Sequence, residues 1–273
     1  MHIETGETPP FPVVRDQRRH RTLSRYHPGR FVDSLRKQGY ASISPADWGM
    51  PLFETSLADW ASFAESWERL GDDRWMGDGG RYRRRQFAAF AVEDGAIVRK
   101  PHQAHFQNRR YNRLNGGLAR WFSPVETEIG DHGVTCTLLR IGEEFASALV
   151  GWAYRSWHAE LHQFRIDATH EFGRPTPEGP HRDGVTAVLM MLVGRRNICG
   201  GVTTLLEKSR FVAELALTQP LQAIVLDDTR LRHSVSPVTA YEEGSPAWRD
   251  ALVITFRPQR TCDLFAIKET CNG

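Results

Sequence analysis

The sequence lacks the patterns that mark secreted, membrane-spanning or zinc-stabilised proteins. Its four cysteines form no CxxC pair and no Cys/His cluster with zinc spacing. No apolar run reaches the roughly 18 residues that a membrane span needs, and no apolar segment near the start could serve as a signal peptide. We therefore expect reduced thiols, a cytoplasmic location and no membrane partner.

The chain also lacks a strong charge of either sign. It carries 35 basic and 33 acidic side chains, a formal net charge of +2. Arginines cluster at 81–85 and at 195–196, which raises the alternative of nucleic-acid binding. Because these arginines alternate along expected strands in a nearly neutral chain, we interpret them as a solvated or structural face and expect no nucleic-acid partner. A homodimer is left open.

Repeats, low-complexity tracts and abrupt shifts of composition are absent from the 273 residues. Residues 1–30 are rich in Pro, Arg and His, and we interpret them as an N-terminal arm that need not be ordered. Residues 31–273 are expected to form one domain, which is long enough to bury a core of its own.

Local patterns predict a few helices followed by many short strands. Helices are expected at 31–37, 56–70 and 145–157, a hairpin at 81–100 around Asp94-Gly95, and a strand at 134–141. Further strands are expected at 160–168, 185–193, 201–206, 221–227, 232–238 and 251–257. Strands this short and evenly spaced predict a mainly β fold with a jelly-roll core, with the N-terminal helices packed outside.

The most informative segment is EGPHRDG, residues 178–184. In an extended chain His181 and Asp183 point to the same side, so an imidazole and a carboxylate can reach one metal ion. His233 opens a later expected strand, which a jelly roll can bring beside the first. Two histidines and one carboxylate on one face of an octahedron favour Fe(II) and leave positions open for 2-oxoglutarate and O2. An isolated HxD triplet is a weak signal, since a surface His followed by a turn Asp produces it by chance.

A 2-oxoglutarate site also needs a cation for the distal carboxylate of the co-substrate. Arg249 lies just before the last expected strand and would supply a planar, permanently charged partner. Arg257 is the second choice, and an ordinary surface arginine beside Asp250 is the alternative interpretation of Arg249.

His-Arg-Asp is also the catalytic triplet of protein kinases. That pattern requires an Asn five residues after the Asp, where this chain has Val188. No glycine-rich nucleotide loop and no DFG accompany the triplet, so a kinase is excluded.

Several motifs together resemble the bacterial 2OG-Fe dioxygenases that include isoleucine 4-hydroxylase-type free amino acid dioxygenases and biofilm-associated relatives. The resemblance runs from about 81 to 257 in constant order: RYRRRQF (81–87), a Gln107 to Arg120 segment, HQFRIDA (162–168), PEGPHRDG (177–184), Asn197 with Gly200-Gly201, DDTRLRHSVSPV (227–238) and RDALVITFRP (249–258).

The resemblance implies a double-stranded β-helix that uses Fe(II), 2-oxoglutarate and O2. The implied reaction is hydroxylation of an unactivated C–H bond, or oxidation of sulfur, on a free L-amino acid or similar small molecule. Asp183 argues against halogenation, because related halogenases lack this carboxylate. Arg182 departs from the Gln expected in relatives, but it should point away from the metal.

Candidate substrate residues come from two segments. Gln163 and Arg165 alternate on the strand before HRDG and are expected to face the pocket, with a solvated face as the alternative. Gln107 and Arg120 come from an aromatic-rich segment that could cover the mouth of the pocket. Two other functions stay open: a 2-oxoglutarate oxygenase for a peptide, protein or carrier-tethered substrate, and a non-catalytic jelly-roll binding module.

Overall fold

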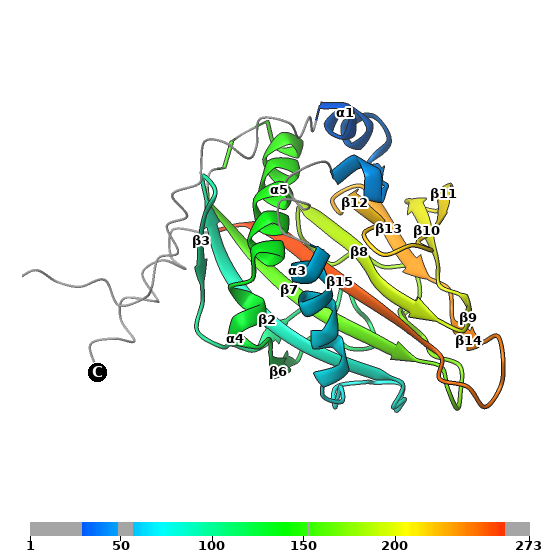
Figure 1. Ribbon diagram of the computed structural model, residues 1–273. Coiled ribbons are helices and arrows are strands. Elements are labelled where there is room, and N and C mark those ends of the chain that lie inside the picture. Colours follow the sequence, from blue (N-terminus) through cyan, green and yellow to red (C-terminus); the bar gives the residue numbers. More distant parts are fainter. Residues whose placement is uncertain (1–28, 49–56, 152, 155, 260–273) are drawn as a thin grey trace, which may run out of the picture.

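The long strands form one large sheet that runs diagonally across Figure 1. The structure is a computed structural model that describes residues 29–48, 57–151, 153–154 and 156–259. The sheet has the order β1-β12-β8-β15-β7-β2-β3, with β6 beside β2, and every pairing except β2 with β6 is antiparallel. Its strands are β1 (Tyr40–Ile43), β2 (Arg83–Glu93), β3 (Ala96–Arg99), β6 (Ser123–Pro124), β7 (Ser156–Asp167), β8 (Ala187–Arg196), β12 (Ala223–Asp227) and β15 (Trp248–Pro258).

A smaller sheet lies beside it, in the order β11-β10-β13. Its strands are β10 (Val202–Glu207), β11 (Arg210–Ala216) and β13 (Leu231–Val235). An isolated antiparallel β-bridge between His181 and His233 adds the segment of His181 and Asp183 to the edge of this sheet, next to β13. After β7 the chain passes back and forth between the two sheets: β8 is in the large sheet, β10 and β11 in the smaller, β12 in the large, β13 in the smaller and β15 in the large. This is the double-stranded β-helix, or jelly roll, expected from the sequence.

Two short ribbons complete the β structure. β9 (Ile198–Gly200) pairs with β14 (Val238–Ala240), and β4 (His105–Phe106) pairs with β5 (Ala119–Arg120). The second ribbon matters most for function, because it carries His105 and Arg120 to the pocket described below.

The helices cover one face of the large sheet (Figure 1). They are α1 (Gly29–Gln38), η2 (Pro45–Trp48), α3 (Leu57–Glu65), η3 (Ser66–Arg69), α4 (Thr127–Gly130) and α5 (Gly133–Leu149). The longest, α5, packs directly on β15 at Gly142, where an added Cβ would lie 2.3 Å from the ring of Phe256. Glycine is therefore needed for this close approach.

Strand alternation divides the large sheet into two chemically different faces, because successive side chains point to opposite sides. In β7, Trp157, Ala159 and Leu161 pack into the main core under the helices. The alternate residues Glu160, His162 and Phe164 line a cavity on the other face. In β7, odd-numbered residues therefore face the helices and even-numbered residues from Glu160 onward face the cavity.

Most of the predicted elements are confirmed. The helix at 31–37 corresponds to α1, and the hairpin at 81–100 to β2 and β3, with Asp94 and Gly95 at φ of 48° and 75°. The helix at 56–70 corresponds to α3 and η3, although its first residue, Ser56, lies outside the described residues. The later expected strands correspond to β7, β8, β10, β12, β13 and β15, while β11 was not predicted.

One predicted strand was wrong in type, and one predicted helix was wrong in its bounds. Residues 134–141 are not a strand but the first half of α5, because Val134, Leu138, Ile141 and Phe145 recur at helical spacing and are all buried. The short β-branched run imitates a strand only when it is considered without the residues that follow. The helix predicted at 145–157 ends at Leu149, and β7 starts at Ser156.

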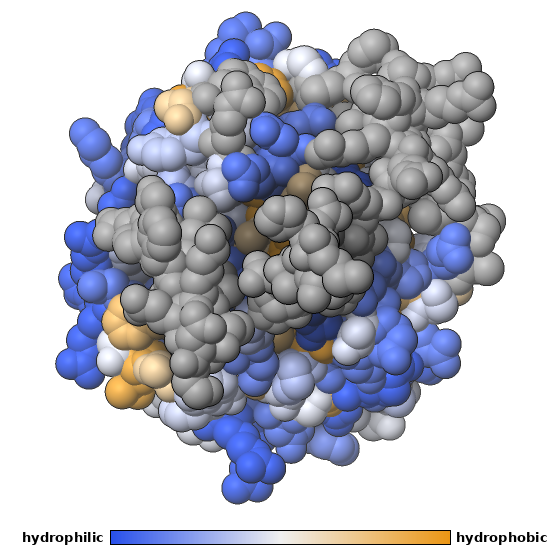
Figure 2. All heavy atoms as spheres, turned by 90° about the vertical axis from the view of Figure 1, so that its left-hand side faces the viewer, coloured by the Kyte–Doolittle hydropathy of each residue, from blue (hydrophilic) through white to orange (hydrophobic). Residues whose placement is uncertain are grey.

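None of the described helices is long and apolar enough to cross a membrane. On the face shown in Figure 2, the coloured residues are mostly hydrophilic, with small apolar groups among them. Cys136 is buried and Cys199 is exposed, whereas Cys262 and Cys271 lie outside the described residues, as does most of the predicted N-terminal arm.

Candidate active site

The structure brings His181, Asp183 and His233 together. One ligand atom from each lies within 4.8 Å of the others. Asp183 Oδ1 is 3.6 Å from His181 Nε2, and Asp183 Oδ2 is 3.9 Å from His233 Nε2. The two imidazole rings are 4.5 Å apart between centroids. Two nitrogens and one carboxylate oxygen thus converge, and this donor set suits Fe(II).

Backbone hydrogen bonds position the segments that carry these side chains. The N–H of His181 donates to the carbonyl of His233 at 3.0 Å, and the N–H of His233 donates back at 2.8 Å. The buried carboxylate of Asp228 accepts from the N–H groups of Asp183, Gly184 and Val185 at 2.9, 2.7 and 3.0 Å. Asp228 therefore fixes the turn on which Asp183 sits.

Side-chain contacts set the tautomer and orientation of two of the candidate ligands. His181 Nδ1 is 3.0 Å from the carbonyl oxygen of Gly179, so this nitrogen donates and Nε2 is left with the lone pair that a metal needs. Gln107 Nε2 donates to Asp183 Oδ1 at 3.1 Å. Glu178 Oε1 lies 3.5 Å from His181 Nε2 and accepts from Asn112 at 3.2 Å.

The charges of the three side chains shift one another's pKa values. Burial lowers the pKa of His181, but the hydrogen bond to Asp183 and the charges of Asp183 and Glu178 outweigh it and raise this pKa to about 9. Burial and the nearby His181 lower the pKa of His233 to about 4. For Asp183 burial acts upward, yet the hydrogen bond from His181 and the charge of His233 bring its pKa well below the usual range. A divalent cation would replace the proton that these three side chains share.

Burial and the Asp183 carboxylate raise the pKa of Asp228 to about 7, against the opposing effect of the three N–H donors.

Arg249 lies in the same cavity, as predicted. It is 5% exposed, and its buried Nε has no hydrogen-bond partner among the described residues. Burial and the charge of Arg195 lower its pKa to about 10. Gly201 packs against it, since an added Cβ would lie 3.2 Å from Arg249 Cδ. A buried guanidinium with an unsatisfied donor is suited to an incoming carboxylate.

Arg257, the second choice, lies at the far end of β15 opposite His158 and also lines the cavity.

The predicted substrate residues fall into two groups. Gln107 and Arg120 line the cavity, which has a volume of about 380 Å³. Gln163 and Arg165 do not, and their predicted position was wrong. Both are odd-numbered residues of β7 and lie on the side of the sheet that faces the helices. Gln163 donates a hydrogen bond to Ser66 at 2.8 Å. Arg165 forms ion pairs with Glu68 and Asp250, each at 2.7 Å.

Other polar residues of the cavity were not predicted. His105, Glu160 and His162 form a second cluster, and Arg85, also not predicted, lies near it together with the predicted Arg120. In the sequence these residues belong to the alternating segments HAELHQF (β7) and RYRRRQF (mostly β2). The alternation shows that the strands have two different faces, but it does not show which face lines the cavity. Arg182, the departure from the family pattern, donates to the carbonyl of Thr229 at 2.8 Å.

Comparison with known proteins agrees with this geometry. A sequence model described as 2OG-Fe dioxygenase matches residues 64–255. This chain belongs to the 2OG-Fe dioxygenase family. It is accordingly an Fe(II)- and 2-oxoglutarate-dependent dioxygenase, which consumes O2 and 2-oxoglutarate. The non-catalytic module is thereby set aside.

Three relatives of this dioxygenase illustrate the range of similarity. L-isoleucine-4-hydroxylase from Bacillus thuringiensis is 28% identical over 163 residues, which cover 58% of this chain and 66% of that protein. 3(1)-hydroxy-L-isoleucine 4-dioxygenase from Pantoea ananatis is 26% identical over 238 residues, covering 83% and 95%. The crystal structure of a bsmA homolog from Methylobium petroleophilum PM1 is 33% identical with a TM-score of 0.75, covering 84% and 92%.

Proposed function

We propose that this dioxygenase hydroxylates an sp3 C–H bond, or oxidises sulfur, in a free L-amino acid or similar small molecule. His181, Asp183 and His233 would hold the iron, and Arg249 would bind the distal carboxylate of 2-oxoglutarate. The observation that carries the assignment is the convergence of three ligand atoms within 4.8 Å beside a buried, unsatisfied arginine. The names of two relatives, both of which act on isoleucine or its hydroxylated form, support the substrate class.

Bound iron would activate O2 with the decarboxylation of 2-oxoglutarate. The chain's own residues hold the candidate iron ligands in position. The Gly179 carbonyl holds the proton of His181 on Nδ1. Gln107 restrains the Asp183 carboxylate, and Asp228 restrains its backbone. The side chains of Ala251 and Val253, on β15, add an apolar part to the lining of the cavity.

The experiment is succinate formation by protein loaded anaerobically with Fe(II), then supplied with 2-oxoglutarate, O2 and each of the twenty L-amino acids. The expected result is succinate stimulated by one or a few amino acids and absent in His181→Ala. Slow succinate formation that no amino acid stimulates would contradict the proposed substrate class. No succinate from iron-replete protein would contradict the assignment of these residues.

A further inference from the structure

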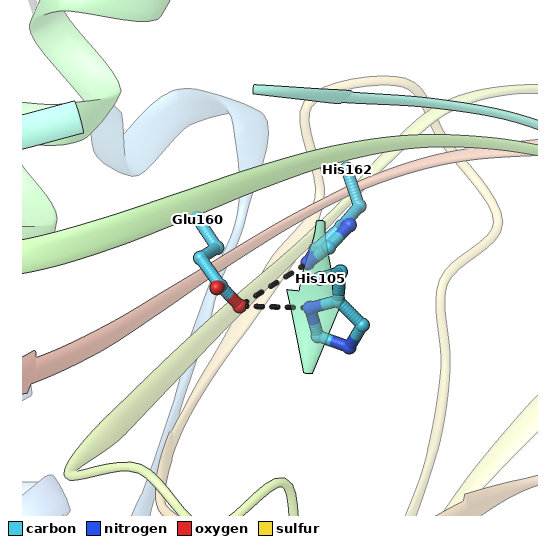
Figure 3. A group of neighbouring side chains, drawn as sticks. All are labelled: His105, Glu160 and His162. Carbon is cyan, nitrogen blue, oxygen red and sulfur yellow. Dashed lines mark hydrogen bonds and ion pairs between the residues drawn. The ribbon is translucent and has the colours of Figure 1, made fainter. Parts of the chain in front are cut away.

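A second cluster of titratable side chains lines the cavity beside the candidate iron ligands. His105, Glu160 and His162 point toward one another, the first from the β4–β5 ribbon and the others from β7 (Figure 3). Glu160 Oε2 is 3.0 Å from His105 Nδ1 and 3.9 Å from His162 Nε2. Its side chain is 12% exposed, and it is a lining residue of the cavity.

The hydrogen-bond donors around the cluster leave Glu160 as an anion among imidazoles. Lys100 Nζ lies 2.8 Å from His158 Nδ1, so that nitrogen accepts and His158 Nε2 donates to Glu160 Oε1 at 3.2 Å. Arg85 Nη2 lies 2.9 Å from His162 Nδ1, which leaves the proton of His162 on Nε2. No lysine or arginine forms an ion pair with Glu160 among the described residues.

The same donors argue against a second metal ion. A metal at His162 Nε2 would have to displace its proton while Nδ1 still accepts from Arg85, which would leave the ring as an imidazolate. The guanidinium of Arg85 would also repel a divalent cation. A small cation that is itself a hydrogen-bond donor, such as an ammonium group, fits the free lone pairs of Glu160 better.

Beside this anion lies a pair of arginines without an anion of their own. Arg85 and Arg120 are 6% and 3% exposed, and the Nε of each is buried without a partner in the described part of the chain. Both stack on Phe122, at 3.7 and 5.4 Å from its ring centroid. Arg83, by contrast, has Asp73 at 2.7 Å. Two adjacent buried guanidinium groups with unsatisfied donors form a site for a carboxylate.

The imidazole of His162 lies beside both sites. One of its nitrogens contacts Arg85, and the other faces Glu160. An α-amino acid carries its ammonium and carboxylate groups on a single carbon, so one molecule can engage both. We propose that Glu160 binds the α-ammonium group of the substrate and that Arg85 and Arg120 bind its α-carboxylate.

This assignment rests on the proposed function and narrows it. Both the amine and the carboxylate must be free, so residues inside a peptide and acyl groups tethered through a thioester are excluded. His105 and Gln107 are alternate residues of one extended segment, roughly 7 Å apart. The first contacts Glu160 and the second Asp183. A substrate held at Glu160 therefore presents a side-chain carbon, rather than its α-carbon, to the iron.

The test compares three probes on anaerobic protein loaded with Fe(II) and 2-oxoglutarate, by calorimetric titration. The probes are L-isoleucine (or whichever of the twenty L-amino acids gives most succinate), its deamino acid and its decarboxylated amine. For Glu160→Gln we expect roughly 10- to 100-fold weaker binding of the amino acid, with the deamino acid unchanged. For Arg85→Lys we expect weaker binding of both acids, with the amine unchanged.

Glu243→Gln and Arg196→Lys remove or exchange an exposed charge outside the cavity and serve as matched controls, and circular dichroism checks the fold of each variant. A purely structural role of Glu160 would weaken all three probes alike and would overturn the inference. So would unchanged amino acid binding in Glu160→Gln, or a second equivalent of metal per chain that is lost in His105→Gln. If no amino acid stimulates succinate although slow turnover of 2-oxoglutarate persists, the proposed substrate class fails and this inference with it.

Discussion

Replacing Arg165 by Met should destabilise the protein and leave its affinity for substrate unchanged. Arg165 donates to both oxygens of Asp250, at 2.8 and 2.7 Å, and to both oxygens of Glu68, at 2.8 and 2.7 Å. The Glu68 side chain is 63% exposed, so its share is at most about 1 kcal/mol. The Asp250 side chain is 4% exposed, and a buried charge that loses its partner typically costs about 3–5 kcal/mol.

The loss should also depend on pH. Burial raises the pKa of Asp250 to about 6, and Arg165 acts against this by lowering it. Because the folded state holds the proton more tightly than the unfolded state, stability already falls as the pH rises from about 4 to about 6. Without Arg165 the folded-state pKa rises further, so the decline continues to higher pH. The cost of Arg165→Met should therefore be smaller at pH 5 than at pH 8.

Urea unfolding at both pH values measures the free energy of unfolding, and a succinate assay measures KM for the amino acid. The double variant Arg165→Met/Asp250→Asn also removes the unpaired charge of Asp250 and should recover much of the lost free energy of unfolding. Glu68→Gln should lower the free energy of unfolding by less than about 1 kcal/mol. Near-normal stability of Arg165→Met together with a raised KM would refute the structural role and return Arg165 to the substrate site.

Other predictions concern the iron site and the helix layer. Asp228→Asn should weaken iron binding by roughly 10- to 100-fold in an anaerobic titration, because one acceptor oxygen of the turn is lost; unchanged affinity would contradict its positioning role. Arg249→Lys should raise KM for 2-oxoglutarate more than KM for the amino acid, and an equal effect on both would count against the assignment. Gly142→Ala should lower the free energy of unfolding by about 1–3 kcal/mol through a clash with Phe256, measured in urea.

The candidate iron ligands and Arg249 could be predicted from the sequence because their chemistry is local or tied to strand order. His181 and Asp183 are two residues apart, and a jelly roll leaves few positions for the third ligand. The faces of β7 could not be assigned in the same way. Gln163 and Arg165 have the same polar character as Glu160 and His162, and only the packing of η3 against one face shows which pair reaches the cavity.

The wrong prediction of a strand at 134–141 has a related cause. Residues 134–141 contain enough β-branched side chains to resemble a strand, but burial on α5 follows a helical stripe that continues to Phe145. Arg120 was predicted as a substrate residue, but its pairing with Arg85 was missed for a different reason. Arg85 and Arg120 lie far apart in the chain, and nothing local indicates that neither has a carboxylate partner.

The reciprocal backbone bonds between His181 and His233 have a consequence for how the protein matures. These bonds attach the segment of His181 to the edge of the smaller sheet through peptide groups alone, so the two imidazoles are neighbours whether or not a metal is bound. Folding can then precede loading, unlike in zinc fingers, where the metal drives folding. Iron would act as a reversible ligand of a finished scaffold, adding about 2.7 kcal/mol of stability when its free concentration is 100 times its Kd. The apoprotein should accordingly survive iron scarcity and regain activity on resupply, without passing through the unfolded state.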